Sequence, residues 1–382
     1  MTTVKMVKLG TLIKPAKLQK CGNDDYPVLS MTMHNGLVFQ SDKFKKSVAS
    51  QDKSTYKVVH RNQLVIGFPI DEGVLATQRI TDVGIVSPAY GIWDVDQTKI
   101  IPEFLEYALR CNRAIDYYKA KLRGSTARRR SLPTPTLLEL DVPLPDIEQQ
   151  RLALTTIRHA KNALDSRQAQ LTKLDELIKA RFVEMFGDPV TNPFNWPTVE
   201  LGQRCEIITG NTPSRAEPEN YGTFIEWIKS DNINTPSTFL TPAQEYLSEV
   251  GFQKCRFVES GSLLMTCIAG SLNCIGNVAV TNRRVAFNQQ INAITPTCDN
   301  VLYLYWLMIL SKPAIHKTIN MALKGILSKS QLSSIKFPFP SIECQNQFAA
   351  FVAEVDKSKV EVQKALDQTQ LLFDSLMQQY FG

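Results

Sequence analysis

The chain has 382 residues, 43% of them hydrophobic, which suffices for two or three domains with real cores and excludes a disordered polymer. No apolar run approaches the ~20 residues that cross a bilayer, and residues 1–10 lack the apolar stretch of a secretory signal, so we expect neither a membrane span nor export. The net charge is +6, and the eight cysteines lack the paired spacing of a zinc site, which indicates reduced, structural thiols in a cytoplasmic protein.

The first half of the chain predicts mixed α and β structure. Short apolar or alternating runs between Gly, Asn and Pro favour strands at 62–70 and 80–93, and a helical period follows at 102–122. Residues 147–186 contain neither Pro nor Gly and favour one long helix, with Pro145 just ahead of it and Gly187 at its end.

The second half predicts the same kinds of element. A Pro- and Asn-rich linker at 189–197 precedes strands at 261–268 and 276–281, and a helical period follows at 301–323. A second long helix is expected after Pro340, ending at Gly382. Each long helix would measure ~60 Å at ~1.5 Å per residue.

Both long helices carry a heptad pattern of apolar residues, which is typical of a coiled coil. The predicted seam residues are Ile157, Ala160, Leu164, Leu171, Leu174, Ile178 and Met185 in the first helix, and Val352, Val355, Val362, Leu366, Phe373, Leu376 and Tyr380 in the second. Arg167 and Arg181 interrupt the first seam, whereas Lys359 and Thr369 interrupt the second at other layers. We therefore favour pairing of the two helices with each other over pairing of each with another chain.

Four short segments recur in the same order, which identifies the chain as a doubled unit. The matching pairs are Leu9-Gly10 with Leu201-Gly202, Leu122-Arg123-Gly124 with Leu323-Lys324-Gly325, residues 142–150 with 337–345, and Met185-Phe186-Gly187 with Tyr380-Phe381-Gly382. The predicted fold class is α+β, with a globular domain at 1–145, a helix at 146–187, a linker and second globular domain at 188–341, and a helix at 342–382.

The sequence carries no pattern that indicates catalysis. A phosphate-binding Gly-Lys-Ser/Thr loop, a Gly-x-Gly-x-x-Gly turn and a His-Glu-x-x-His helix are all missing from the sequence, and the four histidines form no nucleophile pattern. Asn192-Pro193-Phe194 partly matches the tetrapeptide of adenine methyltransferases but lacks its second proline. We predict no catalytic residue, no metal site and no cofactor in this chain.

Polar and basic clusters are the candidate DNA contacts. Residues 1–145 carry 21 lysines and arginines against 14 aspartates and glutamates, which favours phosphate contact, although solvated lysines would give the same excess. Arg suits guanine edges, and Asn and Gln suit adenine edges. The candidates are Lys43, Lys45, Lys46, Arg61, Arg79, Arg123, Arg128, Arg129 and Arg130 in the first half, and Thr212, Ser214, Arg215, Lys229, Asn232, Arg283, Arg284, Asn288, Gln289, Lys324 and Lys329 in the second.

At these residues the chain resembles the specificity subunits of Type I restriction-modification systems. The resemblance lies in the two Leu-Gly openings, in Thr212-Pro213-Ser214 followed by Trp227-Ile228, in Asn288-Gln289-Gln290, in Val86-Ser87-Pro88-Ala89-Tyr90, and in the Pro, Glu and Gln residues that lead into both helices. The first half departs from the pattern, because it lacks a Thr-Pro-Ser turn near Lys14 and has Pro27 at the Trp position.

The resemblance implies two target recognition domains that read the two halves of a split sequence in double-stranded DNA, held apart by an antiparallel coiled coil. It further implies two modification subunits, which methylate adenine with S-adenosylmethionine, and restriction subunits, which cleave DNA with ATP and Mg²⁺. Two alternatives remain open: a specificity subunit of a system whose modification and cleavage activities are fused in one partner, and a coiled-coil scaffold without a DNA role.

Overall fold

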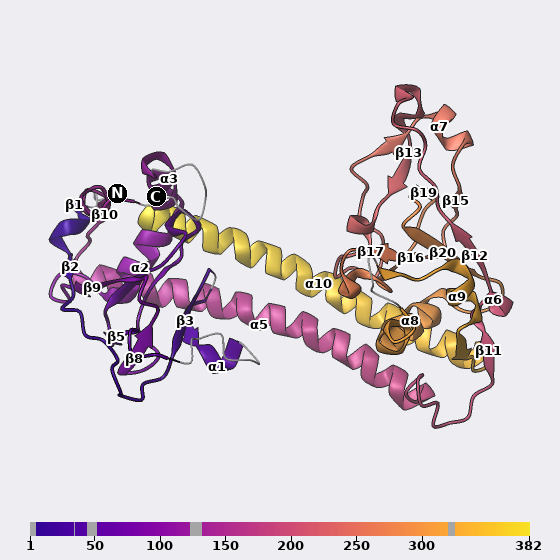
Figure 1. The fold of residues 1–382 in the computed structure, drawn as a ribbon, viewed down its shortest axis with the longest axis horizontal. Coiled ribbons are helices and arrows are strands. Elements are labelled where there is room, and N and C mark those ends of the chain that lie inside the picture. Colours follow the sequence, from indigo (N-terminus) through magenta and orange to yellow (C-terminus); the bar gives the residue numbers. More distant parts are fainter. Residues whose placement is uncertain (1–4, 34, 44–51, 123–131, 320–324) are drawn as a thin grey trace. The chain divides into compact units, whose positions relative to one another are not determined.

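The computed structural model describes residues 5–33, 35–43, 52–122, 132–319 and 325–382, and it is α+β throughout. The chain divides into two compact units (Figure 1). Unit 1 comprises residues 1–168 and 364–382, and unit 2 comprises residues 169–363. Each unit therefore contains one globular part and a stretch of both long helices.

Unit 1 is built from short strands and five helices in the described ranges. The strands are β1 (Met6–Lys8), β2 (Ile13–Pro15), β3 (Leu29–Thr32), β4 (Gly36–Phe39), β5 (Lys57–His60), β6 (Leu64–Ile66), β7 (Leu75–Thr77), β8 (Val83–Val86), β9 (Gly91–Val95) and β10 (Asp141–Pro143). The helices are α1 (Gln40–Lys43), α2 (Pro102–Arg110), α3 (Asn112–Lys121), α4 (Thr134–Leu138) and α5 (Ile147–Phe186), whose second half lies in unit 2.

The described strands of unit 2 range from two to eight residues. They are β11 (Thr198–Glu200), β12 (Cys205–Thr209), β13 (Tyr221–Ile228), β14 (Tyr246–Leu247), β15 (Phe257–Val258), β16 (Leu263–Thr266), β17 (Ile268–Ala269), β18 (Val278–Val280), β19 (Val285–Phe287), β20 (Ile291–Pro296), β21 (Gly325–Ile326) and β22 (Lys336–Pro338). Its helices are α6 (Leu201–Arg204), α7 (Glu249–Gln253), α8 (Val301–His316), α9 (Lys329–Ser334) and α10 (Ile342–Phe381), whose end lies in unit 1.

The two units share one topology, which accounts for the repeated sequence segments. A four-stranded sheet has the order β2-β9-β6-β7 in unit 1 and β12-β20-β16-β18 in unit 2, so the same positions along each half supply the same places in the sheet. The strand before each Leu-Gly pair is antiparallel to the strand before each long helix, with Val7 opposite Val142 and Val199 opposite Phe337. These strand pairs join the start of each globular part to its end.

The second sheet differs between the units. Unit 2 has a four-stranded sheet in the order β14-β13-β19-β15, in which β13 and β19 are parallel, whereas the described part of unit 1 has the separate pairs β3-β4 and β5-β8. The two globular parts therefore share a framework and differ in the strands added to it.

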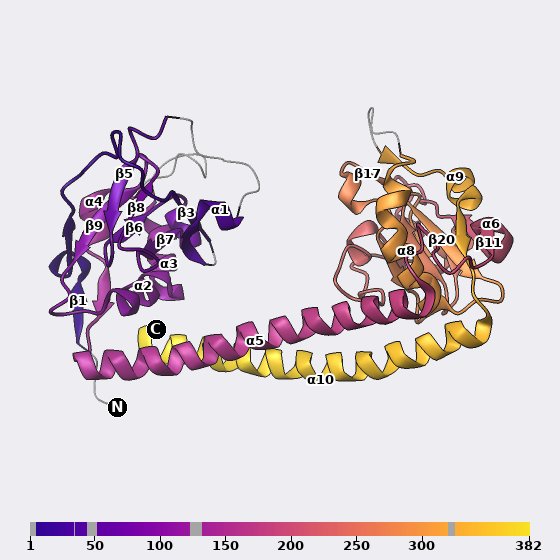
Figure 2. The ribbon, with the colours of Figure 1, turned by 90° about the horizontal axis from the view of Figure 1, so that it is seen from below.

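The long helices begin and end where the sequence predicted them. In unit 2 they run in opposite directions, because Phe186 and Phe182 contact Phe348 while Asp175 pairs with Lys359 farther along (Figure 2). All of the predicted seam residues are buried or partly buried. The seam prediction missed the four phenylalanines Phe182, Phe186, Phe348 and Phe381, which are buried among residues of the globular parts.

Two elements that the sequence predicted as continuous are interrupted in the structure. Residues 102–122 form two helices, because the backbone of Cys111 is extended, with φ −70° and ψ 160°, and separates α2 from α3. Residues 80–93 contain β8 and the start of β9 in place of one strand. The two strands are separated by a turn at Ser87–Tyr90, which is closed by a hydrogen bond of 3.1 Å from Tyr90 N–H to the Ser87 carbonyl.

The remaining predicted elements are shorter than expected. In 62–70 only Leu64–Ile66 is a strand, and the runs 261–268 and 276–281 contain β16 and β18. Helix α8 ends at His316, and the rest of the predicted helical stretch reaches residues 320–324, which lie outside the described residues.

Candidate nucleic-acid interface

Unit 2 gathers several of the predicted contact residues around Trp227. Trp227 is on β13 and is almost fully buried, and its backbone N–H donates to the Glu245 carbonyl at 3.0 Å. This register places the Glu245 side chain beside Lys229, which follows the end of β13. Arg215 reaches the same carboxylate from the 210–217 loop, with Nη2 2.8 Å from Glu245 Oε2. One carboxylate therefore binds two cations.

The same two cations lie against aromatic rings. The Arg215 guanidinium carbon is 5.2 Å from the centre of the Tyr221 ring and 5.7 Å from that of Trp227. The Lys229 ammonium is 5.5 Å from the centre of the Trp227 ring. Hydrogen bonds from Lys229 and Arg215 lower the pKa of Glu245 against the opposing effect of its burial, so this carboxyl is ionised at neutral pH.

Beside this cluster, the 210–217 loop lies against the turn after β19. Thr212 Oγ1 donates to Gln289 Oε1, and the Asn211 N–H donates to the Phe287 carbonyl at 3.2 Å. Gly210 permits this approach, because a Cβ there would lie 2.3 Å from the Asn288 carbonyl oxygen. Thr212 and Gln289, both predicted contacts, are therefore brought together with hydrogen-bonding groups at the surface.

Asn232 and Asn288 are structural residues in this unit. Both are buried. Asn232 Oδ1 accepts from Lys229 N–H at 3.1 Å and its Nδ2 donates to the Pro242 carbonyl at 2.9 Å, whereas Asn288 Oδ1 accepts from Gln290 N–H at 3.0 Å. Each fixes a turn, so base contact by either stays a prediction without geometric support.

The two neighbouring arginines after β18 have different surroundings. Arg283 binds both oxygens of Glu226 and donates to the carbonyls of Leu240 and Thr241 at 3.3 and 3.2 Å, so its guanidinium ties β13 to the loop at 240–241. Arg284 is 56% exposed and pairs with Glu259 at 2.6 Å. Arg284 is therefore the better placed of the two to meet a ligand.

Of the three remaining predicted contacts in unit 2, the structure describes Ser214 and Lys329. The Ser214 hydroxyl accepts from Ala216 N–H at 3.3 Å. Lys329 is exposed at the start of α9. Lys324 lies outside the described residues.

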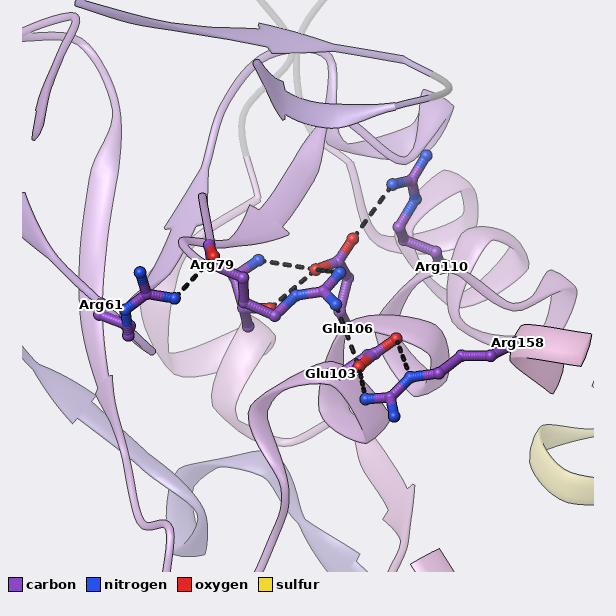
Figure 3. Close-up of polar contacts among 7 residues, drawn as sticks. Arg61, Arg79, Glu103, Glu106, Arg110 and Arg158 are labelled. Carbon is purple, nitrogen blue, oxygen red and sulfur yellow. Dashed lines mark hydrogen bonds and ion pairs between the residues drawn. The ribbon is translucent and has the colours of Figure 1, made fainter. Parts of the chain in front are cut away.

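In unit 1, Arg79 belongs to a network of arginines and buried carboxylates (Figure 3). Arg79 pairs with Glu103 at 3.1 Å and with Glu106 at 3.3 Å, both on α2. Glu106 also pairs with Arg110 at 3.4 Å, and Glu103 binds Arg158 of α5. The network connects a strand end, α2 and a long helix, so a structural role for Arg79 has direct support.

Arg61 forms an exposed ion pair with Asp82. Its Nε is 2.8 Å from Asp82 Oδ1, and its Nη1 donates to the Arg79 carbonyl at 2.7 Å. Lys43 is the last residue of α1, and its side chain is outside the described part of the structure. The other predicted contacts of the first half also lie outside the described residues: Lys45, Lys46, Arg123, Arg128, Arg129 and Arg130.

Arg61 also lines a polar hollow of about 580 Å³ that the sequence did not reveal. Its wall includes Lys14, His60, Asn62 and Gln97, and it is formed by the start of β2, the end of β9 and the turn between β5 and β6. Asn62 donates to Gln97 at 2.9 Å. The residues come from three distant segments, so spacing along the chain gave no signal for this hollow.

The described residues contain neither a metal cluster nor a membrane-spanning helix. No group of three or more His, Cys, Asp or Glu side chains there is arranged to hold a metal ion. Among the described helices, none combines the length and apolarity required to cross a membrane.

Comparison with known proteins gives a family match for most of unit 2. Residues 193–369 match the model of the Type I restriction modification DNA specificity domain. This part of the chain is therefore similar to a Type I DNA specificity domain. It contains the Trp227 cluster, Arg283 and Arg284, and the turn at Gln289.

Sequence similarity to the relative described next covers part of the chain, whereas similarity in fold extends over almost all of it. The chain is 28% identical over 187 residues to the HindI specificity subunit of Haemophilus influenzae, a match that covers 46% of this chain and 39% of that relative. This chain shares its fold with a chain from a type I restriction-modification system, with a TM-score of 0.60 and 16% sequence identity. The match covers 99% of this chain and 97% of the other. The fold is also similar to that of the S subunit from M. genitalium, with a TM-score of 0.57 and 14% sequence identity. This match covers 100% of this chain and 97% of that subunit.

Sequence reasoning missed three polar residues of the specificity domain that lie near the predicted contacts. Glu245 was missed because its partners are 30 and 16 residues away and meet it only through strand register. Lys254 and Arg256 flank the 210–217 loop, since Asn211 donates to the Lys254 carbonyl and accepts from Arg256 N–H, both at 2.8 Å. A basic residue on each side of Cys255 was the available signal for this pair.

Proposed function

We propose that this chain is the DNA sequence-recognition subunit of a Type I restriction-modification complex. The observation that carries the proposal is the DNA specificity domain at 193–369, whose sheet order and closing strand pair recur in unit 1. A doubled framework with different added strands suits a protein that reads two different half-sequences. Each globular part, 1–145 and 188–341, acts as a target recognition domain.

The two long helices form an antiparallel coiled coil in this proposal. Buried seam residues on both helices support it, as do the pair of Lys359 with Asp175 at 2.8 Å and the contact of Arg181 with the Phe351 ring at 5.8 Å. Lys359 interrupts an apolar seam, and a carboxylate on the facing helix compensates it. The coiled coil serves as the spacer, so its length sets the gap between the two half-sites.

The chain supplies recognition, and its partners supply the chemistry. Two modification subunits bind this chain and methylate one adenine in each half-site with S-adenosylmethionine. Restriction subunits that use ATP and Mg²⁺ complete the assembly, which acts on double-stranded DNA in the cytoplasm. No residue of this chain is assigned to catalysis. Linking two readers raises the affinity for the split target, because the second contact is intramolecular.

Mapping of methylated adenines tests this function. The chain is co-expressed with a Type I modification subunit in a host that lacks adenine methylation, and a host with the modification subunit alone is the control. We expect methylated adenines in one bipartite motif with a constant gap, only when this chain is present. Methylation without a shared motif, or the same motif in the control, would refute the proposal.

A further inference from the structure

Glu245 binds two cations, Arg215 and Lys229, and its carboxylate is partly exposed to solvent. Each oxygen of the Glu245 carboxylate takes one cation, Arg215 on Oε2 and Lys229 on Oε1. Glu103 and Glu106 of unit 1 also bind two arginines each, but their side chains are only 9% and 10% exposed. Glu245 is 34% exposed and Arg215 is 60% exposed, so a ligand from solvent can reach this cluster.

The two cations also have contacts with groups other than Glu245. Arg215 lies against the Tyr221 and Trp227 rings, and Lys229 lies against Trp227. Tyr221 is fixed in turn, because its hydroxyl donates to the Pro213 carbonyl at 3.0 Å. Contacts of this kind attract a cation to the face of an aromatic ring. The aromatic rings can therefore hold both cations when the carboxylate leaves.

The ligand that matches this arrangement is a phosphate of the DNA backbone. A phosphodiester carries one negative charge over two free oxygens, as a carboxylate does, and Arg binds both groups with the same geometry. Thr212 and Gln289 add neutral hydrogen-bonding groups beside the cluster. Lys229 and Glu245 also line a small hollow of about 150 Å³, together with Asp231, Asn232 and Gln244. A neighbouring base edge would thus meet polar side chains.

We infer that Arg215 and Lys229 form a binding site for a DNA backbone phosphate, and that Glu245 occupies this site in the free protein and competes with DNA for it. The inference rests on the proposed function. Because the phosphate must displace a carboxylate that neutralises both cations, Glu245 lowers the affinity of this domain for DNA of any sequence. Stable binding then depends more on base contacts.

The test is a salt titration of DNA binding by the full chain. Wild type, Glu245→Gln and the control Glu354→Gln are titrated with a fluorescein-labelled duplex of random sequence at increasing KCl concentration. Glu354 pairs with Lys357 at 2.6 Å on the exposed face of α10, so its replacement changes the net charge equally without touching the cluster. Thermal unfolding confirms that all three proteins are folded.

We expect Glu245→Gln to bind random DNA roughly three- to tenfold more tightly at low salt than wild type. The slope of the logarithm of the binding constant against the logarithm of the salt concentration should be steeper by about 0.9 for each additional phosphate that the protein neutralises. Glu354→Gln should match wild type. Adding Arg215→Ala to Glu245→Gln should reduce this steeper slope by the equivalent of about one phosphate.

Three outcomes separate the possibilities. Equal slopes for Glu245→Gln and Glu354→Gln overturn the inference, while the proposed function stands if wild type still selects one sequence from a random pool. Weaker binding by Glu245→Gln also overturns it, because Glu245 then positions the cations instead of competing for them. Failure of wild type to select any sequence refutes the proposed function.

Discussion

Gln150 and Gln345 make matching hydrogen bonds at equivalent places in the two units. The Oε1 of Gln150 accepts the Ile101 N–H at 2.8 Å, and that of Gln345 accepts the Asn300 N–H at 2.9 Å. Each Nε2 donates to the proline carbonyl five residues earlier, at 2.9 and 3.0 Å. Both side chains are fully buried.

These bonds fasten each long helix to its globular part. Ile101 and Asn300 are the residues just before α2 and α8, so each glutamine joins the start of a long helix to the start of a helix in the globular part. The third bonds differ, because Gln150 donates to the Lys99 carbonyl and Gln345 to the buried Asp299 carboxylate. The repeated Glu-x-Gln motif of the sequence thus has a physical explanation.

Replacement of Gln150 by leucine should destabilise unit 1. The Ile101 N–H loses its partner in a buried site, and an unsatisfied buried group costs about 1–3 kcal/mol. Denaturant unfolding measures this loss. Gln149→Leu is the control, because Gln149 is exposed and its replacement should change the free energy of unfolding by less than about 0.5 kcal/mol. Equal effects of the two substitutions would contradict the assigned role.

The long helices could be predicted because forty residues without Pro or Gly leave few alternatives to a continuous helix. The heptad also gave the buried side of each helix. It did not give Phe182 or Phe348, because these residues face the globular part as well as the partner helix, and a two-helix pattern has no place for them.

The globular topology was beyond sequence reasoning for a different reason. Most strands of the first sheet in unit 1 have three residues, too few for alternation to be recognised, and their order comes from pairing over long distances. Likewise, Arg79 resembled a free surface cation because Glu103 and Glu106, its partners, are 24 and 27 residues away. Charge along the chain did not show which cations are already paired.

The Arg158–Glu103 pair should make the stability of unit 1 dependent on pH. Burial raises the pKa of Glu103, but the hydrogen bond from Arg158 and the charge of Arg79 outweigh it and leave the pKa below its ordinary value. A carboxyl with a lowered pKa stabilises the folded state above its unfolded pKa, and this contribution is lost as the pH falls through the folded pKa. Glu103→Gln should therefore cost about 1–3 kcal/mol at neutral pH and less in acid.

Urea unfolding over a range of pH measures this dependence. The control is Glu148→Gln, which removes an exposed pair with Arg151 at 3.0 Å and should cost less than about 1 kcal/mol. A difference between wild type and Glu103→Gln that is constant from neutral to acid pH would show that the charge of Glu103 makes no contribution.

Phe182 should be among the most sensitive positions of unit 2. It is fully buried, and its ring centre lies 5.0, 5.5 and 5.4 Å from those of Phe186, Tyr303 and Phe348. Phe182→Ala should cost about 3–5 kcal/mol, because it leaves a cavity among rings that cannot close over it. The neighbouring Val183 is 43% exposed, so Val183→Ala should cost less than about 0.5 kcal/mol.

Hydrogen exchange locates the effect of this substitution. Amides of α8 and β20 should exchange faster in Phe182→Ala, and those of α2 and β9 should keep the protection they have in wild type. Unchanged exchange in unit 2 would mean that this aromatic cluster does not hold α5 to the globular part.

The most direct test of the spacer role lengthens both helices and maps the recognised DNA. Seven residues that preserve the heptad are inserted after Gln168 in α5 and after Gln363 in α10, at the division between the units, so contacts within each unit are kept. Seven residues add about 10 Å of helix, or about three base pairs of DNA. We predict methylated adenines in the same two half-sequences, separated by a gap about three base pairs longer. An unchanged gap with unchanged half-sequences would contradict the claim that the helices set the spacing.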